Sequence, residues 1–217
     1  AAAANGLTVA WEYIVPSPEF DVAQAVGLMV TSPVDAYFPA VGPGHMAAVA
    51  GGAFQQGLTP LSMMAAPSFN DAFVREGFAL APLFNSGSMY LMAFVAPYEA
   101  ETAGHATMRA TFTAMGIDSA NTFLVAGWAS QHHLKGVLEA ANKGGDLSRA
   151  GIRRAAGSVY VDSDGMMPQR ELGQNRADAE SFIAVPDGTI GSGVKLLAGN
   201  YVGPSAGGYD WESGPCS

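Results

Sequence analysis

The chain has 217 residues, of which 49% are hydrophobic and 13% charged, a composition that excludes a disordered chain or a coiled coil because both carry more charge. The net charge of −9 excludes a typical nucleic-acid partner, since nucleic-acid affinity comes mainly from cationic side chains. The apolar stretches are shorter than the roughly 18–20 residues that a bilayer span requires, so we expect no direct membrane insertion of this segment.

The N-terminus begins with Ala1 to Ala4 followed by Asn5-Gly6, which predicts the last turn of a helix with a left-handed cap. So short a helix cannot nucleate by itself, and we therefore expect a fragment of a longer protein. Cys216 is the only cysteine, so we predict neither an intrachain disulfide nor a cysteine-based zinc site.

The first half of the chain predicts alternating strands and helices. Residues 7–15 are rich in β-branched and aromatic side chains and precede Pro16, which indicates a strand, and Asp21 is placed to cap the helix that follows. The other expected elements are strands at 36–41, 61–65 and 89–95 and helices at 22–30, 45–56 and 71–76. This order is typical of a parallel sheet covered by helices on both faces, in which ligands bind beyond the carboxyl ends of the strands.

The second half, from Tyr98, is mainly helical. Helices are expected at 103–115, 122–141 and 148–156. A polar loop at 160–176, strands at 181–185 and 195–202 around the turn Pro186-Asp187-Gly188, and a tail from Gly203 complete the chain.

Five stretches, taken in order, resemble one known family. They are GLTVAWEYIVPSPEFD, PVDAYFPAVGPGHMAAVAGGAFQQGL, TPLSMMAAPSFND, NTFLVAGWASQHHLKGVLEAANKGGDLSRAGIRRA and DGMMPQRELGQNR. Their order and spacing over residues 6–202 are similar to the branched-chain amino-acid type substrate-binding proteins of ABC transporters. These are type I periplasmic binding proteins of the Leu/Ile/Val-binding kind.

The resemblance implies an α/β fold of two doubly wound lobes joined by crossing strands, with the first lobe incomplete in this chain. Residues 1–96 would then form an α/β portion of the second lobe, and 97–176 the helical portion of the first lobe with the return crossing. Residues 177–203 would supply the closing strands of the second lobe, and 204–217 a tail. Without its central sheet the first-lobe portion should expose an apolar helix face within 98–176.

Two strand exits are the predicted ligand contacts, both because ligands bind at the carboxyl ends of such strands and because the family binds there. The residues concerned are Ala40, Val41, Gly42, Pro43 and Gly44 at the first exit and Met64, Ala65, Ala66 and Pro67 at the second. His45 starts the helix beside the first exit, and Trp128 stands where the family often has an aromatic near the hinge. A tight turn at Gly42-Pro43-Gly44 and helix packing by Trp128 explain these residues equally well.

The second exit lacks the acidic residue that several relatives use to pair with a ligand ammonium. A buried ammonium without a carboxylate partner is costly, so this departure disfavours an α-amino acid ligand. Apolar or aromatic compounds, carboxylates and amides are favoured instead.

The resemblance implies a periplasmic or otherwise extracytoplasmic receptor that closes on a small ligand and delivers it to the membrane permease of an ABC transporter. It implies no catalysis, and we predict no metal or other cofactor. A cytosolic ligand-sensing regulator of the same fold is the main alternative. An α/β hydrolase is a weaker one, because Ser86-Gly87-Ser88 lacks the Gly-x-Ser-x-Gly nucleophile elbow.

Overall fold

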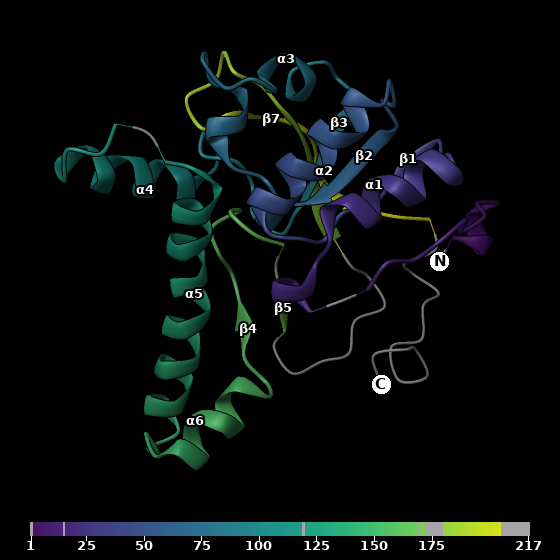
Figure 1. The fold of residues 1–217 in the computed structure, drawn as a ribbon. Coiled ribbons are helices and arrows are strands. Elements are labelled where there is room, and N and C mark those ends of the chain that lie inside the picture. The colour runs from purple at the N-terminus through teal and green to yellow at the C-terminus, as the bar shows by residue number, and fades with distance from the viewer. Residues whose placement is uncertain (1, 15, 119, 169, 172–179, 205–217) are drawn as a thin grey trace. The chain divides into compact units, whose positions relative to one another are not determined.

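The computed structural model describes residues 2–14, 16–118, 120–168, 170–171 and 180–204 (Figure 1). The chain divides into two compact units. Unit 1 comprises Ala1–Ala93 with Phe182–Ala198, and unit 2 comprises Phe94–Ser181 with Gly199–Ser217. No helix within the described ranges is long and apolar enough to cross a membrane.

Most of a five-stranded mixed sheet belongs to unit 1, and its described strands run in the order β1-β2-β3-β6-β7. The strands are β1 (Ala36–Tyr37), β2 (Leu61–Ala65), β3 (Met89–Ala93), β6 (Glu180–Pro186) and β7 (Val194–Val202). The first three are parallel, whereas β6 runs antiparallel to β3. The predicted strands at 61–65, 89–95, 181–185 and 195–202 are thus found. The one predicted at 36–41 is shorter, because Pro39 has no N–H to donate to a ladder.

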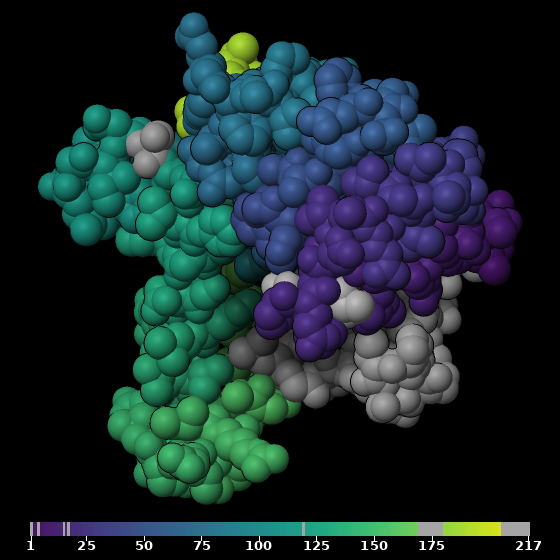
Figure 2. Space-filling model, viewed as in Figure 1, coloured from purple at the N-terminus to yellow at the C-terminus, as the bar shows by residue number. Residues whose placement is uncertain are grey.

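Two helices, α1 (Val22–Thr31) and α2 (Pro43–Gln55), pack against each other beside this sheet (Figure 1). In Figure 2 the purple and blue atoms of this part of the chain lie side by side. Asp21 caps α1 as predicted, its Oδ1 accepting from the N–H groups of Ala23 and Gln24 at 2.8 and 3.3 Å. The helix α2 begins two residues earlier than predicted, because Pro43 suits the first helical position.

Short helical segments complete unit 1. They are η1 (Ala3–Asn5), η2 (Ser17–Glu19), η3 (Ala66–Ser68), η4 (Asp71–Val74) and α3 (Ala81–Phe84). Gly6 ends η1 in the left-handed conformation predicted for it, with φ of 71°. The helix expected at 71–76 is only the four-residue η4, whose first turn Asn70 caps.

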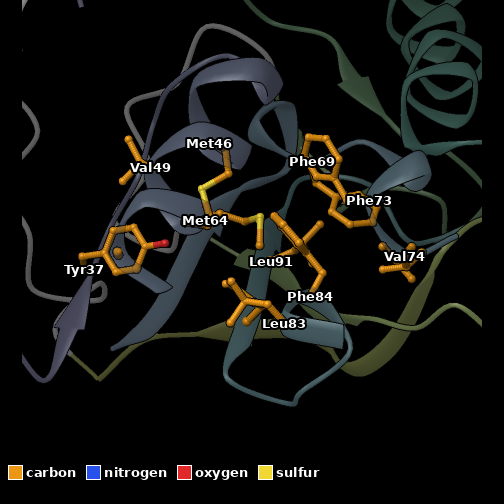
Figure 3. Close-up of a cluster of buried hydrophobic side chains, with 14 of the residues drawn as sticks. Tyr37, Met46, Val49, Met64, Phe69, Phe73, Val74, Leu83, Phe84 and Leu91 are labelled. Carbon is orange, nitrogen blue, oxygen red and sulfur yellow. The ribbon is translucent and has the colours of Figure 1, made fainter. Parts of the chain in front are cut away.

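The apolar core of unit 1 lies between α2 and the sheet. Figure 3 shows Met46 of α2 pointing toward Met64 of β2, with Leu91 of β3 and Phe84 beside Met64. All four side chains are buried, and full burial of each contributes about 1.5–3 kcal/mol to folding. The alternating burial along β2 and β3 matches the pattern expected of strands that cover this core.

The prediction of a strand at 7–15 is wrong for residues 7–14, which form no strand. Trp11 and Tyr13 instead pack their side chains against the core of unit 1, and Trp11 Nε1 donates to Ser32 O at 3.1 Å. High β-propensity reflects a side chain's fit to a half-buried surface, and these two rings find such a surface without strand pairing. Val15 lies outside the described residues.

The described part of unit 2 contains three helices, α4 (Ala103–Ala114), α5 (Thr122–Lys143) and α6 (Arg149–Ala156), close to the predicted ranges. Part of the predicted loop at 160–176 pairs instead, as β4 (Tyr160–Val161) with β5 (Arg170–Glu171). Residues 172–176 lie outside the description. The core of this unit is buried around Met108, Val125 and Met166.

An apolar stripe is exposed along α5, as predicted for a helix within 98–176. Its members are Phe123, Leu124, Leu134 and Leu138, which are 49%, 48%, 53% and 38% exposed. Their spacing places all four on one side of the helix. The opposite side buries Val125 and Ala129, and Val137 is buried at the edge of the stripe.

The turn from Asp162 to Met167 packs against the start of α4. The Ser163 hydroxyl accepts from Met167 N–H at 2.8 Å and donates to Met167 O at 2.9 Å. Gly104 N–H donates to Asp164 O at 3.0 Å. A Cβ at Gly104 would lie 2.5 Å from Met166 Cγ and 2.8 Å from Ser163 O, so only glycine allows this approach.

We predict that Gly104→Ala destabilises the protein by about 1–3 kcal/mol, because the added methyl group overpacks this contact. Gly127→Ala is the matched control, since Gly127 also lies within a helix but a Cβ there meets open space. That substitution should stabilise by about 0.5–1 kcal/mol. Urea unfolding of both variants measures the difference, and equal stabilities would contradict the packing described here.

His105 is fully buried at the start of α4, with both ring nitrogens partnered. Nε2 lies 3.2 Å from Ala96 O and Nδ1 lies 2.7 Å from Thr102 Oγ1. A carbonyl oxygen can only accept, so the neutral ring carries its proton on Nε2 and Nδ1 accepts from the threonine hydroxyl. Burial is the largest cause that lowers the pKa of His105, and Arg109 lowers it further, against opposing contributions from Ala96 O, Glu101 and Glu99.

Stability should therefore fall as the pH drops. The unfolded chain takes up a proton below the ordinary histidine pKa of about 6.5, while the folded chain resists protonation until a lower pH. Below about pH 6.5 the folded state should therefore lose stability through this residue as the pH falls. His105→Gln, which still offers an N–H toward Ala96 O, should show a weaker pH dependence by chemical unfolding. An unchanged pH dependence would show that His105 does not titrate in this way.

Candidate functional site

Two strand exits meet at the carboxyl edge of the β1–β2 pair. Ala65 N–H, at the end of β2, donates to Pro39 O beyond β1 at 3.3 Å. The buried Ser68 hydroxyl accepts from Val41 N–H at 3.2 Å and donates to Pro39 O at 3.3 Å. One side chain of the second exit therefore fixes two backbone groups of the first.

A cavity of about 460 Å³ opens at these exits. It is lined by Phe20, Ala40, Val41, Gly42, His45, Ala65, Pro67 and Ser68, all of which belong to unit 1. The volume lies within the roughly 300–1,000 Å³ typical of small-molecule sites. The described lining residues are mostly apolar, and they include one imidazole and one hydroxyl.

The start of α2 gives this cavity a positive electrostatic end. Gly42 is the N-cap and supplies no side-chain acceptor, and Pro43 has no N–H. The N–H groups of Gly44 and His45 have no acceptor within the helix, because the first turn of any helix leaves its donors unpaired. The helix dipole adds partial positive charge at the same place, which favours anionic or acceptor groups over cations.

Aromatic rings form one wall. The Phe20 and His45 rings have centroids 5.1 Å apart at 34°, and Tyr13 lies behind Phe20 at 5.3 Å. The Tyr13 hydroxyl accepts from Asp21 N–H at 3.1 Å, which fixes the ring behind Phe20. The residue that caps α1 is therefore hydrogen-bonded to the ring that packs against Phe20 of the cavity wall.

The predicted site residues fall into four groups. Six of them, Ala40, Val41, Gly42, His45, Ala65 and Pro67, line the cavity. Pro43 and Gly44 form the first turn of α2, while Met64 and Ala66 are buried. Trp128 lies in unit 2 and packs edge-on against Phe112, with ring centroids 5.6 Å apart, so its contact with a ligand stays a prediction.

Sequence reasoning missed two lining residues, Phe20 and Ser68. Phe20 directly precedes the cap Asp21. An apolar residue at this position commonly packs against the first turn of the helix, so the sequence position of Phe20 favours a structural role. Ser68 matched the pattern of a helix cap, but Asn70 takes that role.

A second cavity, of about 300 Å³, lies before the first residues of β1 and β2, lined by Asp35, Leu58, Pro60 and neighbours. Ligands of open α/β sheets bind beyond the carboxyl ends of the strands, so the cavity at the exits is the candidate site. In the part of the chain that the structure describes, no three His, Cys, Asp or Glu side chains gather to hold a metal ion.

Solved structures share this fold, although no family model and no curated protein matches the sequence. A fatty acid ABC transporter substrate-binding protein from Thermomonospora curvata superimposes with a TM-score of 0.75 and 20% identity, over 88% of this chain and 49% of that one. An ABC transporter substrate-binding protein from Aeropyrum pernix gives 0.69 and 14%, over 94% and 55%. A branched-chain amino acid ABC transporter from Thermus thermophilus with bound valine gives 0.65 and 12%, over 94% and 56%.

The chain therefore has the fold of the type I periplasmic binding proteins, which confirms the fold that the sequence predicted. The structures that share it are substrate-binding proteins of ABC transporters. The chain spans about half the length of each of these structures.

We predict that Ser68→Ala destabilises the protein by about 1–3 kcal/mol, because it removes the acceptor of Val41 N–H and one of the two donors to Pro39 O. Ser130→Ala is the control: Ser130 is exposed on α5 and donates only to Ala126 O of its own helix. That change should be neutral or slightly stabilising. Thermal unfolding of both variants tests the role of Ser68, and equal effects would contradict it.

Proposed function

We propose that the protein is the solute-binding receptor of an ABC uptake transporter. The observation that carries this proposal is the cavity of about 460 Å³ at the carboxyl ends of β1 and β2, in a chain with the type I periplasmic-binding-protein fold. Open α/β sheets bind ligands at this edge, so the fold and the cavity point to the same place.

The ligand is a small amino-acid-like molecule, amide or carboxylate. Apolar side chains such as Val41 and Pro67 supply most of the wall, which suits an apolar ligand body. The unpaired N–H groups at the start of α2 suit an acceptor such as an amide or carboxylate oxygen. Two of the structures with this fold are a fatty acid substrate-binding protein and a branched-chain amino acid transporter with bound valine, and both of these compounds carry a carboxylate.

The mechanism is closure of two lobes around the ligand. Binding shifts the population toward a closed form, because only that form contacts the ligand from both sides. The closed form is the one that the membrane permease of the transporter recognises, and the receptor works outside the cytoplasm. Binding and release of the ligand need no covalent step and no catalysis.

Filling the cavity tests this proposal. A panel of amino acids, aromatic acids and short amides should contain a compound that raises the melting temperature, since saturation at a hundred times Kd adds about 2.7 kcal/mol. Ala40→Trp places a large ring in the cavity and should abolish that rise. Ala48→Trp, at an exposed position on α2 outside the cavity, should preserve it.

Two outcomes would contradict the proposal. One is that no compound of the panel stabilises the unmodified protein. The other is that Ala40→Trp responds to the ligand as the unmodified protein does, which would place binding elsewhere.

A further inference from the structure

Among the eight described residues that line the candidate cavity, none offers a carboxylate side chain. The nearest acidic residues in sequence flank Phe20. Asp21 uses its Oδ1 to cap α1, and Glu19 is exposed outside the lining. An ammonium group entering this cavity would lose water without gaining an anionic partner, which is costly.

The start of α2 adds to this penalty. Its N–H groups and the positive end of its dipole lie beside His45, at the same cavity. A cationic group would meet like-signed partial charge there. The cavity therefore discriminates by charge.

The aromatic wall adds discrimination by shape. Phe20 is half-buried, with its inner side packed on the core of unit 1 and its ring next to His45. Tyr13 supports it from behind, through its own hydrogen bond from Asp21 N–H. The small side chains of Ala40 and Ala65, elsewhere in the lining, leave room for a ring. Paired aromatic rings gain more than their buried area alone provides.

From the charge and the shape of this cavity, we infer that the ligand is an aromatic carboxylic acid without an α-ammonium group, and that Phe20 determines this specificity. The inference rests on the proposed receptor function and narrows its ligand class. The aromatic ring of the ligand lies in the cavity against Phe20 and His45.

Two matched pairs of ligands test the inference on the purified protein by isothermal titration calorimetry. 3-Phenylpropanoate and L-phenylalanine differ in the ammonium group, and we expect the first to bind at least about tenfold more tightly. 3-Phenylpropanoate and 3-cyclohexylpropanoate differ in aromaticity, and we expect about threefold or greater preference for the phenyl compound.

Three variants assign the preference to Phe20. Phe20→Leu should weaken 3-phenylpropanoate binding by about threefold or more and remove the preference over the cyclohexyl compound, whereas Phe20→Tyr should retain both. Phe54→Leu is the control, because Phe54 is exposed on α2 away from the cavity, and it should bind as the unmodified protein does.

The outcomes distinguish a failure of the aromatic-acid inference from a failure of the proposed receptor function. If L-phenylalanine or L-leucine binds as tightly as 3-phenylpropanoate, or if Phe20→Leu leaves the preferences unchanged, the aromatic-acid inference is overturned while the receptor function stands. If none of these compounds and no member of the wider panel binds, both fail.

Discussion

The parallel pairing of β1 with β2 is the constraint on which the candidate site depends. Ala36 is registered with Leu61 and Tyr37 with Ser62, so both strands point their carboxyl ends to one edge. A parallel pair needs a crossover, and α2 supplies it. The start of α2 must therefore lie at that same edge, beside the loop that leaves β1. The cavity, the unpaired N–H groups and the Ser68 hydrogen bonds all follow from this single arrangement.

Much of the fold could be predicted from the sequence, because strand and helix periodicities alternate clearly and proline, glycine and Asp21 mark several boundaries. The wrong or missing predictions concern segments whose structure depends on whether they find a strand to pair with. Residues 7–14 have the composition of a strand, but side-chain packing by Trp11 and Tyr13 satisfies them without a ladder. The direction of β6 was also not predicted, since its antiparallel pairing with β3 depends on a partner far away in the sequence.

The candidate site was likewise predictable from the sequence only in part. Its two exit loops could be predicted, because the carboxyl-end rule and the family resemblance both depend on chain order. Phe20 and Ser68 could not, because each has a local explanation as a helix-start residue that hides its tertiary role. Phe20 reaches the cavity only because η2 and the cap of α1 turn its ring toward His45. Met64 shows the converse: it was predicted at an exit, but strand alternation turns its side chain into the core.

The mixed sheet also has a consequence for how the protein is made. Leu91 of β3 pairs with Ala184 of β6, and the whole of α4, α5 and α6 is synthesised between these two partners. One edge of β3 must therefore wait, unpaired, while the ribosome adds the intervening helices. Contacts so distant in sequence slow folding, and open strand edges favour aggregation during that interval. The nascent chain thus has most need of chaperone protection between the emergence of β3 and that of β6.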